Sequence, residues 1–312
     1  MTHGRITGWG VNLPTKVLTN HDLASMVDTS DEWITERSGI ETRHVDGTVT
    51  EMSTIAAKKA MSKAGISPNQ VDLLILATTT PDQRVPASSS IIQDKLNLSC
   101  GALDLNAACS GFVYGLVTAM QFVEGGMECV MVIGSDALSQ ITNWEDRSTC
   151  VLFGDGAGAV IVERNAEKPS LLGWDLMSDG SAASLLYCEH DDKIVMHGQE
   201  VFRKAVLAME EAATAAIAQA KITIDDIALV VPHQANIRII ETALKRLGIP
   251  NEKAALVLKR TGNTSAASIP LALIDAIESN QITPGELILL VGFGAGMTSA
   301  AAVLRWDPPQ TI

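Results

Sequence analysis

The stretch from Asn106 to Val123 constrains the fold more than any other part of the sequence. It opens with small residues around Cys109 and then stays almost wholly apolar for about four helical turns. A helix that is apolar on all sides has to be buried, so we expect this one at the centre of the molecule. Cys109 then lies at or just before the first turn, where free backbone N–H groups and the helix dipole favour an anion.

A cysteine in this position is either a nucleophile or a small buried side chain, and this stretch alone does not separate the two. The thiolate is the attacking species, and an ordinary thiol is only a few per cent ionised at neutral pH. A dipole contribution of ~1 kcal/mol lowers a pKa by less than about one unit. A reactive Cys109 would therefore need a second helper, for which we expect a histidine.

The composition favours a layered α/β protein. The chain has 312 residues, of which 46% are hydrophobic and 4% aromatic, and layered α/β cores are typically rich in aliphatic side chains. No apolar run reaches the ~18 residues that span a bilayer, and the N-terminal residues lack a signal-peptide core. Five cysteines without a Cys-x-x-Cys pair argue against a disulfide framework or a zinc ribbon. We therefore expect a cytoplasmic, reduced enzyme without a membrane segment.

The net charge of −13 opposes general nucleic-acid binding.

Strands alternate with helices along the chain, which predicts a parallel or mixed sheet covered on both faces. Two short helices capped by Asn20 and Ser30 come early in the chain. The other elements expected in the first part lie at 5–10, 51–64, 71–78, 87–97, 103–105, the central helix, 128–134 and 157–162. The order recurs at 199–220, 227–233, 237–247, 255–258, 266–279, 286–292 and 300–306. We therefore expect two duplicated α/β halves, 1–165 and 166–312, whose Cys109 and Asn263 loops meet at a pseudo-twofold axis.

Two glycine clusters, at 153–159 and 292–297, invite a nucleotide-binding interpretation. A dinucleotide fingerprint has to leave a strand and open a helix, whereas both clusters run into β-rich segments. We interpret them as tight turns between strands. The Glu, His and Asp side chains between 189 and 197 have no recognisable ligand spacing, so we expect a solvated loop and no metal site.

Trp33 and Arg37 lie four residues apart on a short predicted helix, so they share a face. An indole beside a guanidinium suits an adenine ring with phosphates nearby. A half-buried tryptophan beside a solvated arginine is the plainer interpretation, and the pair alone does not exclude it.

His233 ends a predicted strand, where open α/β sheets tend to place chemistry, and Asn263 lies in the loop expected to face it. Cysteine, histidine and asparagine in this order also occur in papain-like proteases. The sequence lacks their Cys-Gly-Ser-Cys-Trp type of signature, and its cysteine lies deep in the chain. A Cys-His-Asn hydrolase is therefore a remote alternative.

Five motifs, spread in order over nearly the whole chain, carry a family resemblance. They are Asn106-Ala-Ala-Cys109-Ser-Gly-Phe, Phe153-Gly-Asp-Gly-Ala-Gly, Val231-Pro-His233-Gln-Ala-Asn236, Gly262-Asn263-Thr-Ser-Ala-Ala-Ser and Gly292-Phe-Gly-Ala-Gly. The sequence thereby resembles the thiolase superfamily, specifically β-ketoacyl-acyl-carrier-protein synthase III, which primes fatty acid synthesis. Asn263 separates it from chain-elongating synthases, which use Cys-His-His. The resemblance implies a thiolase-like fold, with duplicated α/β halves packed as an α-β-α-β-α sandwich.

The resemblance also implies a reaction in two stages. Cys109 takes an acyl group from acyl-CoA; malonyl-acyl carrier protein then loses carbon dioxide, and its carbanion attacks the acyl group. His233 and Asn263 would donate hydrogen bonds to the decarboxylating thioester, and the backbone N–H groups of Cys109 and Ala295 would form the oxyanion hole. No cofactor would be bound permanently, and the enzyme would be a homodimer.

The same resemblance assigns the coenzyme A site. Trp33 and Arg147 would hold the adenine, Arg37 would lie near the phosphates, and Asn236 and Phe202 would line the pantetheine channel. Val85 stands where housekeeping members often carry a phenylalanine at the acyl pocket. The loop between 179 and 197 is shorter than usual, and Ala-Gly-Met-Thr-Ser replaces the usual Gly-Gly-Phe-Thr-Trp after residue 294. These departures leave acyl specificity open, so a secondary-metabolite condensing enzyme is the alternative. A non-catalytic binding protein would not need all three of the proposed reactive side chains.

Residues 238–260 form a locally basic segment in an acidic chain. It carries two acidic side chains, Glu241 and Glu252, and six basic ones, Arg238, Lys245, Arg246, Lys253, Lys259 and Arg260. Acyl carrier proteins are acidic, and complementary charge raises the association rate and fixes the docking register. We expect Arg238, Lys245 and Arg246 to form a carrier-docking face, with an ordinary solvated helix face as the alternative.

Overall fold

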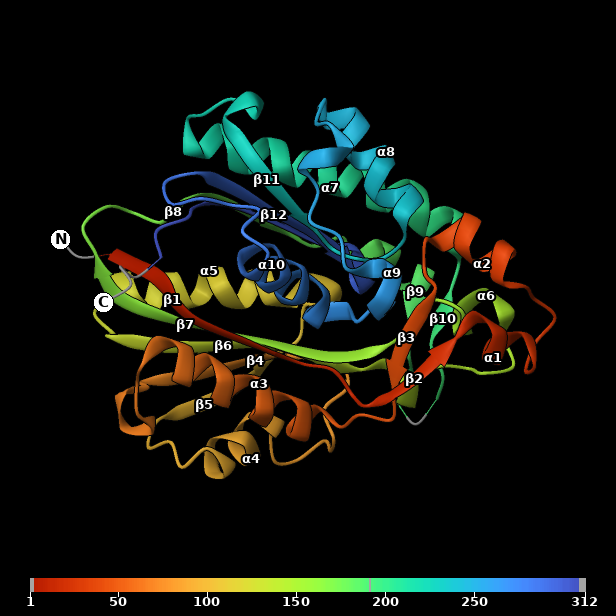
Figure 1. The fold of residues 1–312 in the computed structure, drawn as a ribbon, viewed down its shortest axis with the longest axis horizontal. Helices are drawn as coiled ribbons and strands as arrows, with labels where there is room; N and C mark the ends of the chain where they lie inside the picture. Colours follow the sequence, from red (N-terminus) through yellow and green to blue (C-terminus); the bar gives the residue numbers. More distant parts are fainter. Residues whose placement is uncertain (1–2, 191, 309–312) are drawn as a thin grey trace.

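The computed structural model describes residues 3–190 and 192–308, which form five layers (Figure 1). Helices α5 (Gly111–Glu124) and α10 (Ser268–Glu278) lie in the middle, between two sheets. Helices α3 (Val49–Ala64) and α4 (Ser88–Lys95) cover the outer face of one sheet. Helices α7 (Gly198–Ala220) and α8 (Ile237–Leu247) cover the outer face of the other. The predicted α-β-α-β-α sandwich is therefore confirmed.

The two sheets repeat one strand pattern. The first has the order β1-β7-β6-β4-β5 and the second the order β8-β13-β12-β11. In each, the first three strands are antiparallel and the next joins in parallel. A parallel bridge between Val230 and Ala254 stands in the second sheet where β5 stands in the first. The strands are β1 (His3–Asn12), β4 (Leu73–Ala77), β5 (Gly101–Leu105), β6 (Cys129–Ala137), β7 (Asp155–Ala166), β8 (Leu171–Met177), β11 (Ile227–Pro232), β12 (Leu287–Gly294) and β13 (Thr298–Arg305).

The remaining elements gather at one end of the molecule (Figure 1). They are β2 (Lys16–Thr19), α1 (Asn20–Ala24), α2 (Asp31–Ser38), β3 (Thr42–Val45), α6 (Arg147–Cys150), β9 (Leu186–Tyr187), β10 (Val195–Met196) and α9 (Leu258–Thr261). Strands β2 and β3 pair with each other, as do β9 and β10. Helices α1 and α2 match the two short helices expected early in the chain, whereas the other short pieces were not predicted, because none is long enough to show a period.

Helix α5 has the expected central position. Nine of its 14 residues are buried, and Phe112 and Leu116 belong to the core that fills the space between the sheets. Its cover is incomplete in a single chain, however, because Phe122 stays 39% exposed. A single chain therefore leaves part of this apolar helix exposed to water.

Three local predictions were wrong. Thr19, not Asn20, caps α1, because its hydroxyl accepts from Asp22 N while the buried Asn20 amide donates to Ile40 O at 2.8 Å. Residues 255–258 form no strand beyond the Ala254 bridge, since Gln234 Oε1 accepts from the N–H groups of residues 257 and 258.

The first glycine cluster is not a turn between strands. Its later glycines lie inside β7, where a Cβ at Gly158 would come 2.6 Å from Pro270 Cβ of α10. Glycine there lets the central helix pack directly on the sheet. The second cluster does turn between β12 and β13, with Gly296 at φ 69°. Ser30 caps α2 as expected, accepting from Trp33 N at 3.1 Å.

Strand β7 runs one residue past the expected division at 165 and continues to Ala166. The division into 1–165 and 166–312 therefore stays a prediction about folding units rather than an observed boundary. Among the described residues, no helix is long and apolar enough to cross a bilayer.

Candidate active site

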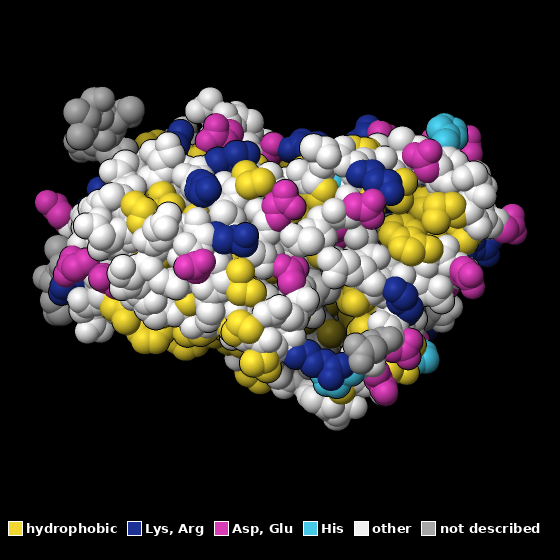
Figure 2. Space-filling model, turned by 90° about the horizontal axis from the view of Figure 1, so that it is seen from below, with side chains coloured by type: hydrophobic (Ala, Val, Ile, Leu, Met, Phe, Trp, Pro, Cys, Tyr) yellow, Lys and Arg dark blue, Asp and Glu magenta, His cyan; other side chains and the backbone are white. Residues whose placement is uncertain are grey.

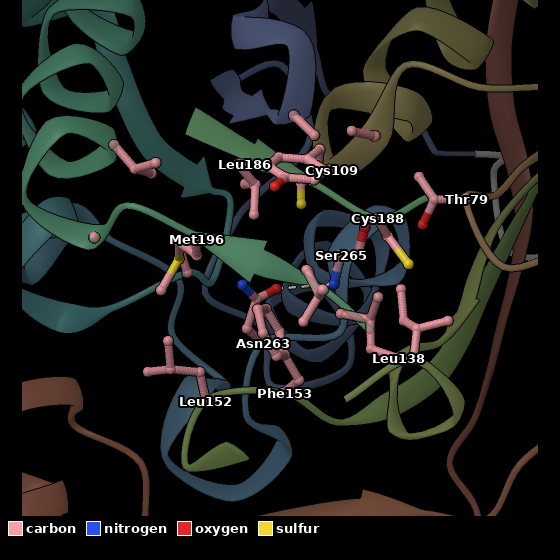
Figure 3. Close-up of a pocket in the computed structure, with 18 of the residues that line it drawn as sticks. Thr79, Cys109, Leu138, Leu152, Phe153, Leu186, Cys188, Met196, Asn263 and Ser265 are labelled. Atoms are coloured by element: carbon pink, nitrogen blue, oxygen red, sulfur yellow. Dashed lines mark hydrogen bonds between the residues drawn. The ribbon is translucent and has the colours of Figure 1, made fainter. Parts of the chain in front are cut away.

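A cavity of about 1190 Å³ lies where the two halves meet, and Cys109, His233 and Asn263 all line it. Figure 3 shows the Cys109 sulfur and the Asn263 side chain entering the same space from different segments. The three side chains come from three separate parts of the sequence, so the fold alone brings them together. The predicted meeting of the Cys109 and Asn263 loops is thus seen in the structure.

Cys109 sits on a 3₁₀ turn, Ala108–Ser110, directly before α5. Ala108 adopts a left-handed φ of 48°, and Asn106 Oδ1 accepts from its N–H at 3.1 Å. A non-glycine residue held at positive φ marks a turn that its surroundings over-determine. The turn places the thiol at the cavity wall instead of in the helix interior.

The Cys109 thiol is protonated at neutral pH. Burial raises its pKa to about 12, a hydrogen bond from Ser265 lowers it, and the nearby Asp136 carboxylate raises it. The dipole of α5 therefore does not produce a standing thiolate, in line with the expectation that Cys109 needs help.

His233 follows β11 and is 1% exposed. Burial lowers its pKa to about 3, so the imidazole is neutral. Its Nδ1 lies 2.6 Å from Ser268 Oγ, and that oxygen also accepts from Gln234 N at 3.3 Å.

This network is compatible with both neutral tautomers of His233. When the Ser268 hydroxyl donates to Nδ1, the imidazole proton sits on Nε2. An Nε2–H group is a donor, which is what an oxygen gaining negative charge requires. If the hydroxyl turns to accept from Nδ1–H instead, Nε2 becomes a proton acceptor. Ser268 therefore serves either role of the histidine.

Asn263 is held from both sides and is 7% exposed. It forms a parallel bridge with Phe153, through Asn263 N to Leu152 O at 2.8 Å and Gly154 N to Asn263 O at 2.9 Å. Its Oδ1 accepts from Ser265 N at 2.9 Å, the dashed contact in Figure 3. With the oxygen engaged, Nδ2 is the group available to a ligand in the cavity.

The turn after β12 lies against the Cys109 turn. A Cβ built on Gly294 would lie 2.6 Å from Cys109 N, and Ala295 lines the cavity next to it. The Cys109 N–H also lies close to its own sulfur, where a hydrogen bond from it lowers the pKa of the thiol. This arrangement is compatible with an oxyanion hole at Cys109 and Ala295.

The outer part of the cavity carries the predicted aromatic and basic side chains. Arg37 stacks on the Trp33 ring at 4.4 Å, and Arg147 lies at 5.0 Å from the same ring. Arg147 also donates to Asp28 O at 2.7 Å. Trp33 and Arg37 line the cavity, whereas Arg147 contacts Trp33 without lining the cavity itself.

Two more predicted residues line the cavity, and a third does not. Phe202 and Asn236 both lie in its wall. Asn236 has structural tasks as well, because it caps α8 by accepting from Arg238 N and donates to Arg37 O at 2.8 Å. Val85 is 85% exposed and does not contact the cavity of its own chain. Its assignment to an acyl pocket therefore stays a prediction.

The basic segment is less free than the sequence indicated. Arg246 pairs with Glu210 of α7 at 2.5 Å, Lys259 pairs with Glu41 at 3.0 Å, and Arg260 pairs with Asp275. Arg238 and Lys245 are exposed, and no ion pair among the described residues includes either. Much of the predicted excess charge is thus neutralised within the chain.

The polar loop around His190 borders the cavity, and Asp191 lies outside the described residues. Within the described ranges, no three His, Cys, Asp or Glu side chains converge as a metal site would require.

Sequence reasoning missed two polar side chains of the site. Ser268 was part of a quoted motif, but only the fold places it against His233. Asp136 lies near the end of the buried strand β6 and accepts from Ala266 N, beyond the Asn263 turn, at 3.0 Å. A buried acid at a strand end was the available signal, although it pointed to no particular partner.

Comparisons with known proteins settle the family. Profiles described as 3-oxoacyl-[acyl-carrier-protein (ACP)] synthase III and its C-terminal part match residues 103–180 and 217–306. The β-ketoacyl-[acyl-carrier-protein] synthase III of Geobacillus kaustophilus is 46% identical over 306 residues, covering 96% of this chain and 98% of the relative. The chain belongs to the β-ketoacyl-acyl-carrier-protein synthase III family.

Solved structures of this family have the same fold. The synthase III structure from Aquifex aeolicus matches with a TM-score of 0.95 at 46% identity, covering 97% of this chain and all of that one. The priming β-ketosynthase of the R1128 polyketide pathway matches with a TM-score of 0.94 at 34% identity, covering 99% and 97%. The resemblance read from the five motifs is confirmed, the fold is that of thiolases, and the protein is an acyltransferase.

Proposed function

We propose that this synthase III starts fatty acid synthesis by joining an acyl-CoA to malonyl-acyl carrier protein, through an acyl group carried on Cys109. The observation that carries the proposal is the convergence of Cys109, His233 and Asn263 on one cavity whose outer part holds Trp33 and Arg37. No permanently bound cofactor is needed for either stage.

In the first stage, the Cys109 sulfur attacks the thioester carbonyl of acyl-CoA. The acyl–sulfur bond to coenzyme A breaks, the thiol proton of Cys109 leaves with the coenzyme A thiolate, and a Cys109 thioester remains. The backbone N–H groups of Cys109 and Ala295 would hold the tetrahedral oxygen. His233 assists when Nδ1–H donates to Ser268 and Nε2 accepts the thiol proton.

In the second stage, the malonyl thioester loses carbon dioxide and its electron pair moves onto the thioester oxygen. Neutral His233, as the Nε2–H tautomer, and Asn263 Nδ2 would both donate to that oxygen. The resulting carbanion attacks the acyl carbonyl and expels Cys109 as a thiolate, which takes up a proton from water, giving β-ketoacyl-acyl carrier protein and the free thiol. Two neutral donors suit this step, because neither can protonate the carbanion as an acid would.

Coenzyme A would approach along the outer part of the cavity. Trp33 already carries two guanidinium groups, from Arg37 and Arg147, so an adenine can stack there and its phosphates have cations close by. Phe202 and Asn236 would border the pantetheine arm between this end and Cys109.

A homodimer is part of the proposal. Strand β5 is a sheet edge, and exposed Leu103 and Phe122 lie on β5 and α5. Hydrophobic side chains form a strip along one margin of the face seen in Figure 2. An uncovered hydrophobic edge favours pairing with a second copy, and such a copy could bring its Val85 to the neighbouring cavity.

The malonyl carrier would dock on α8. Arg238 borders the cavity and Lys245 lies two turns further along the exposed face of the helix. Arg246 contributes less, because Glu210 offsets its charge. A condensing enzyme of secondary metabolism remains the second candidate, favoured by the likeness to the polyketide priming enzyme.

The deciding experiment is mass spectrometry of the intact protein after incubation with a panel of acyl-CoAs. We expect one acyl adduct, located on the peptide that contains Cys109 and absent from Cys109→Ala. Cys188→Ser is the matched control, because this second thiol lines the same cavity. An adduct on another cysteine, with Cys109→Ala fully active, would overturn the proposal.

A further inference from the structure

The chain contains two copies of the turn that carries Cys109. In the first, Asn106 Oδ1 accepts from the N–H of Ala108, whose φ is 48°. In the second, Asn263 Oδ1 accepts from the N–H of Ser265, whose φ is 49°. Each turn is followed by one of the two central helices, so Cys109 in the first copy corresponds to Ala266 in the second.

The N–H group at this position is open in the first copy. Gly294, at the end of β12, faces Cys109 N, where a Cβ would come within 2.6 Å. The backbone at Gly294 is extended, at φ −158°, which any residue could adopt. Glycine is therefore required by space and not by conformation, and it leaves the Cys109 N–H accessible.

The corresponding N–H group in the second copy, that of Ala266, is hydrogen-bonded within the chain. Strand β6 stands in the first sheet where β12 stands in the second, so Asp136 near its end corresponds to Gly294. Asp136 Oδ2 accepts from Ala266 N at 3.0 Å, and Thr80 Oγ1 accepts from Ala137 N at 2.8 Å. Ala137 corresponds to Ala295, so both donors of the second copy are bound by groups of the chain itself.

Asp136 is fully buried and its other oxygen is anchored as well. Oδ1 accepts from Thr79 N at 2.7 Å and from the hydroxyls of residues 78, 79 and 80. The carboxylate thus joins the loop after β4 to the turn that begins at Asn263. Because buried, charge-assisted hydrogen bonds are strong, this junction is rigid.

We propose that Asp136 is a positioning residue for decarboxylation: its carboxylate occupies the second copy of the oxyanion hole and thereby fixes the turn from which Asn263 acts. The first copy has glycine at the corresponding position and stays open for the substrate oxygen. This inference rests on the proposed roles of Cys109 and Asn263.

An acidic residue at position 136 has a cost for Cys109, which argues that the carboxylate has a function of its own. The Asp136 charge raises the pKa of Cys109, which disfavours the nucleophile. A neutral residue at 136 would relieve that effect. An asparagine, however, would present an N–H group to Ala266 N–H whenever its oxygen faced the Thr78–Thr80 loop, and the turn would lose its anchor.

The test separates the two half-reactions. Release of carbon dioxide from malonyl-acyl carrier protein is measured in a Cys109→Ala background, and acyl transfer from acyl-CoA is measured with Cys109 present. We expect Asp136→Asn to lower decarboxylation at least about tenfold more than acyl transfer. Asp155→Asn is the matched control, because Asp155 is also buried and accepts from backbone Gly47 N and Ser139 N, away from Ala266. It should affect both half-reactions equally.

A second pair of variants keeps the test decisive if Asp136→Asn folds poorly. Thr80→Val removes the hydroxyl that binds both Asp136 and Ala137 N and should lower decarboxylation selectively, by a smaller factor. Gly294→Ala should do the reverse, impairing acyl transfer while decarboxylation in the Cys109→Ala background continues.

Equal loss of both half-reactions in Asp136→Asn and Thr80→Val would overturn the inference, as would normal decarboxylation in both. Asn263→Ala distinguishes this failure from failure of the proposed function. If Asn263→Ala retains decarboxylation, the proposed role of Asn263 is wrong; if it loses decarboxylation while both variants retain it, only the role of Asp136 is wrong.

Discussion

The inner and outer parts of the cavity are built in different ways. At the inner end, His233 and Asn263 are nearly inaccessible and each is fixed by hydrogen bonds to its own surroundings. At the outer end, Arg37 and Arg147 are exposed; both stack on Trp33, and Arg147 also donates to Asp28 O. The inner end is rigid before any ligand arrives, while the outer end can rearrange around one.

This difference separates rate from affinity. Donors that are fixed in advance stabilise developing charge without reorganising at the moment of reaction. Exposed cations gain only modest energy, because water and salt screen them. We therefore expect substitutions at the inner end to lower kcat and those at the outer end to raise KM.

The largest effect tests the inner end. Asn263→Ala should lose condensation by ~100-fold or more, the scale for one oxyanion-hole donor, yet still accept an acyl group on Cys109. A neutral amide can stabilise an enolate but cannot activate a thiol. Rapid-quench measurement of each half-reaction checks this, and equal losses in both would contradict the division of labour.

A smaller effect concerns the burial of His233 at the same end, which makes stability depend on pH. His233 has an unfolded-state pKa of 6.5 that burial lowers to about 3. The unfolded chain therefore binds a proton between these pH values and the folded chain does not, so the free energy of unfolding falls as pH falls below 6.5. By pH 5 the loss amounts to ~2 kcal/mol.

His233→Gln removes this contribution. Urea unfolding at pH 7 and pH 5 should show a smaller acid-induced loss for the variant than for the parent protein. The same acid sensitivity in both would mean that His233 is more open to water than its position indicates.

The smallest effect tests the outer end. Arg238→Glu should weaken the apparent affinity for malonyl-acyl carrier protein by about threefold to tenfold at low salt, and less as salt rises. Arg246→Glu is the control, because Glu210 already offsets Arg246. Acyl transfer from free acyl-CoA should change little in either variant. If Arg238→Glu binds the carrier as the parent does at low salt, the exposed face of α8 is only a solvated surface.

The long elements were predictable because their patterns report burial directly. The all-round apolar sequence of α5 and the aliphatic runs of β4, β6 and β12 follow from their places between other layers. The repeated element order also predicted that the Cys109 and Asn263 turns would meet. The motifs around these turns identified the family, which composition alone could not do.

The rest depended on contacts between distant residues. Only the fold shows that Gln234 takes the hydrogen bonds that a strand at 255–258 would have needed. The ion pair between Arg246 and Glu210 joins two helices whose facing sides no local pattern specifies. Likewise, no local pattern specifies that Val85 lies away from the cavity of its own chain.

The shared cavity has a consequence for the order in which substrates bind and products leave. Under the proposed function, acyl-CoA and the malonyl carrier would both bring a thioester to the same wall, beside Cys109, so their pantetheine arms would compete for one cavity. Free coenzyme A left after the first transfer would therefore stand in the way of the incoming carrier. Its departure from the proposed site at Trp33 would become a checkpoint, and the concentration of coenzyme A in the surroundings would then affect how often the enzyme begins a new chain.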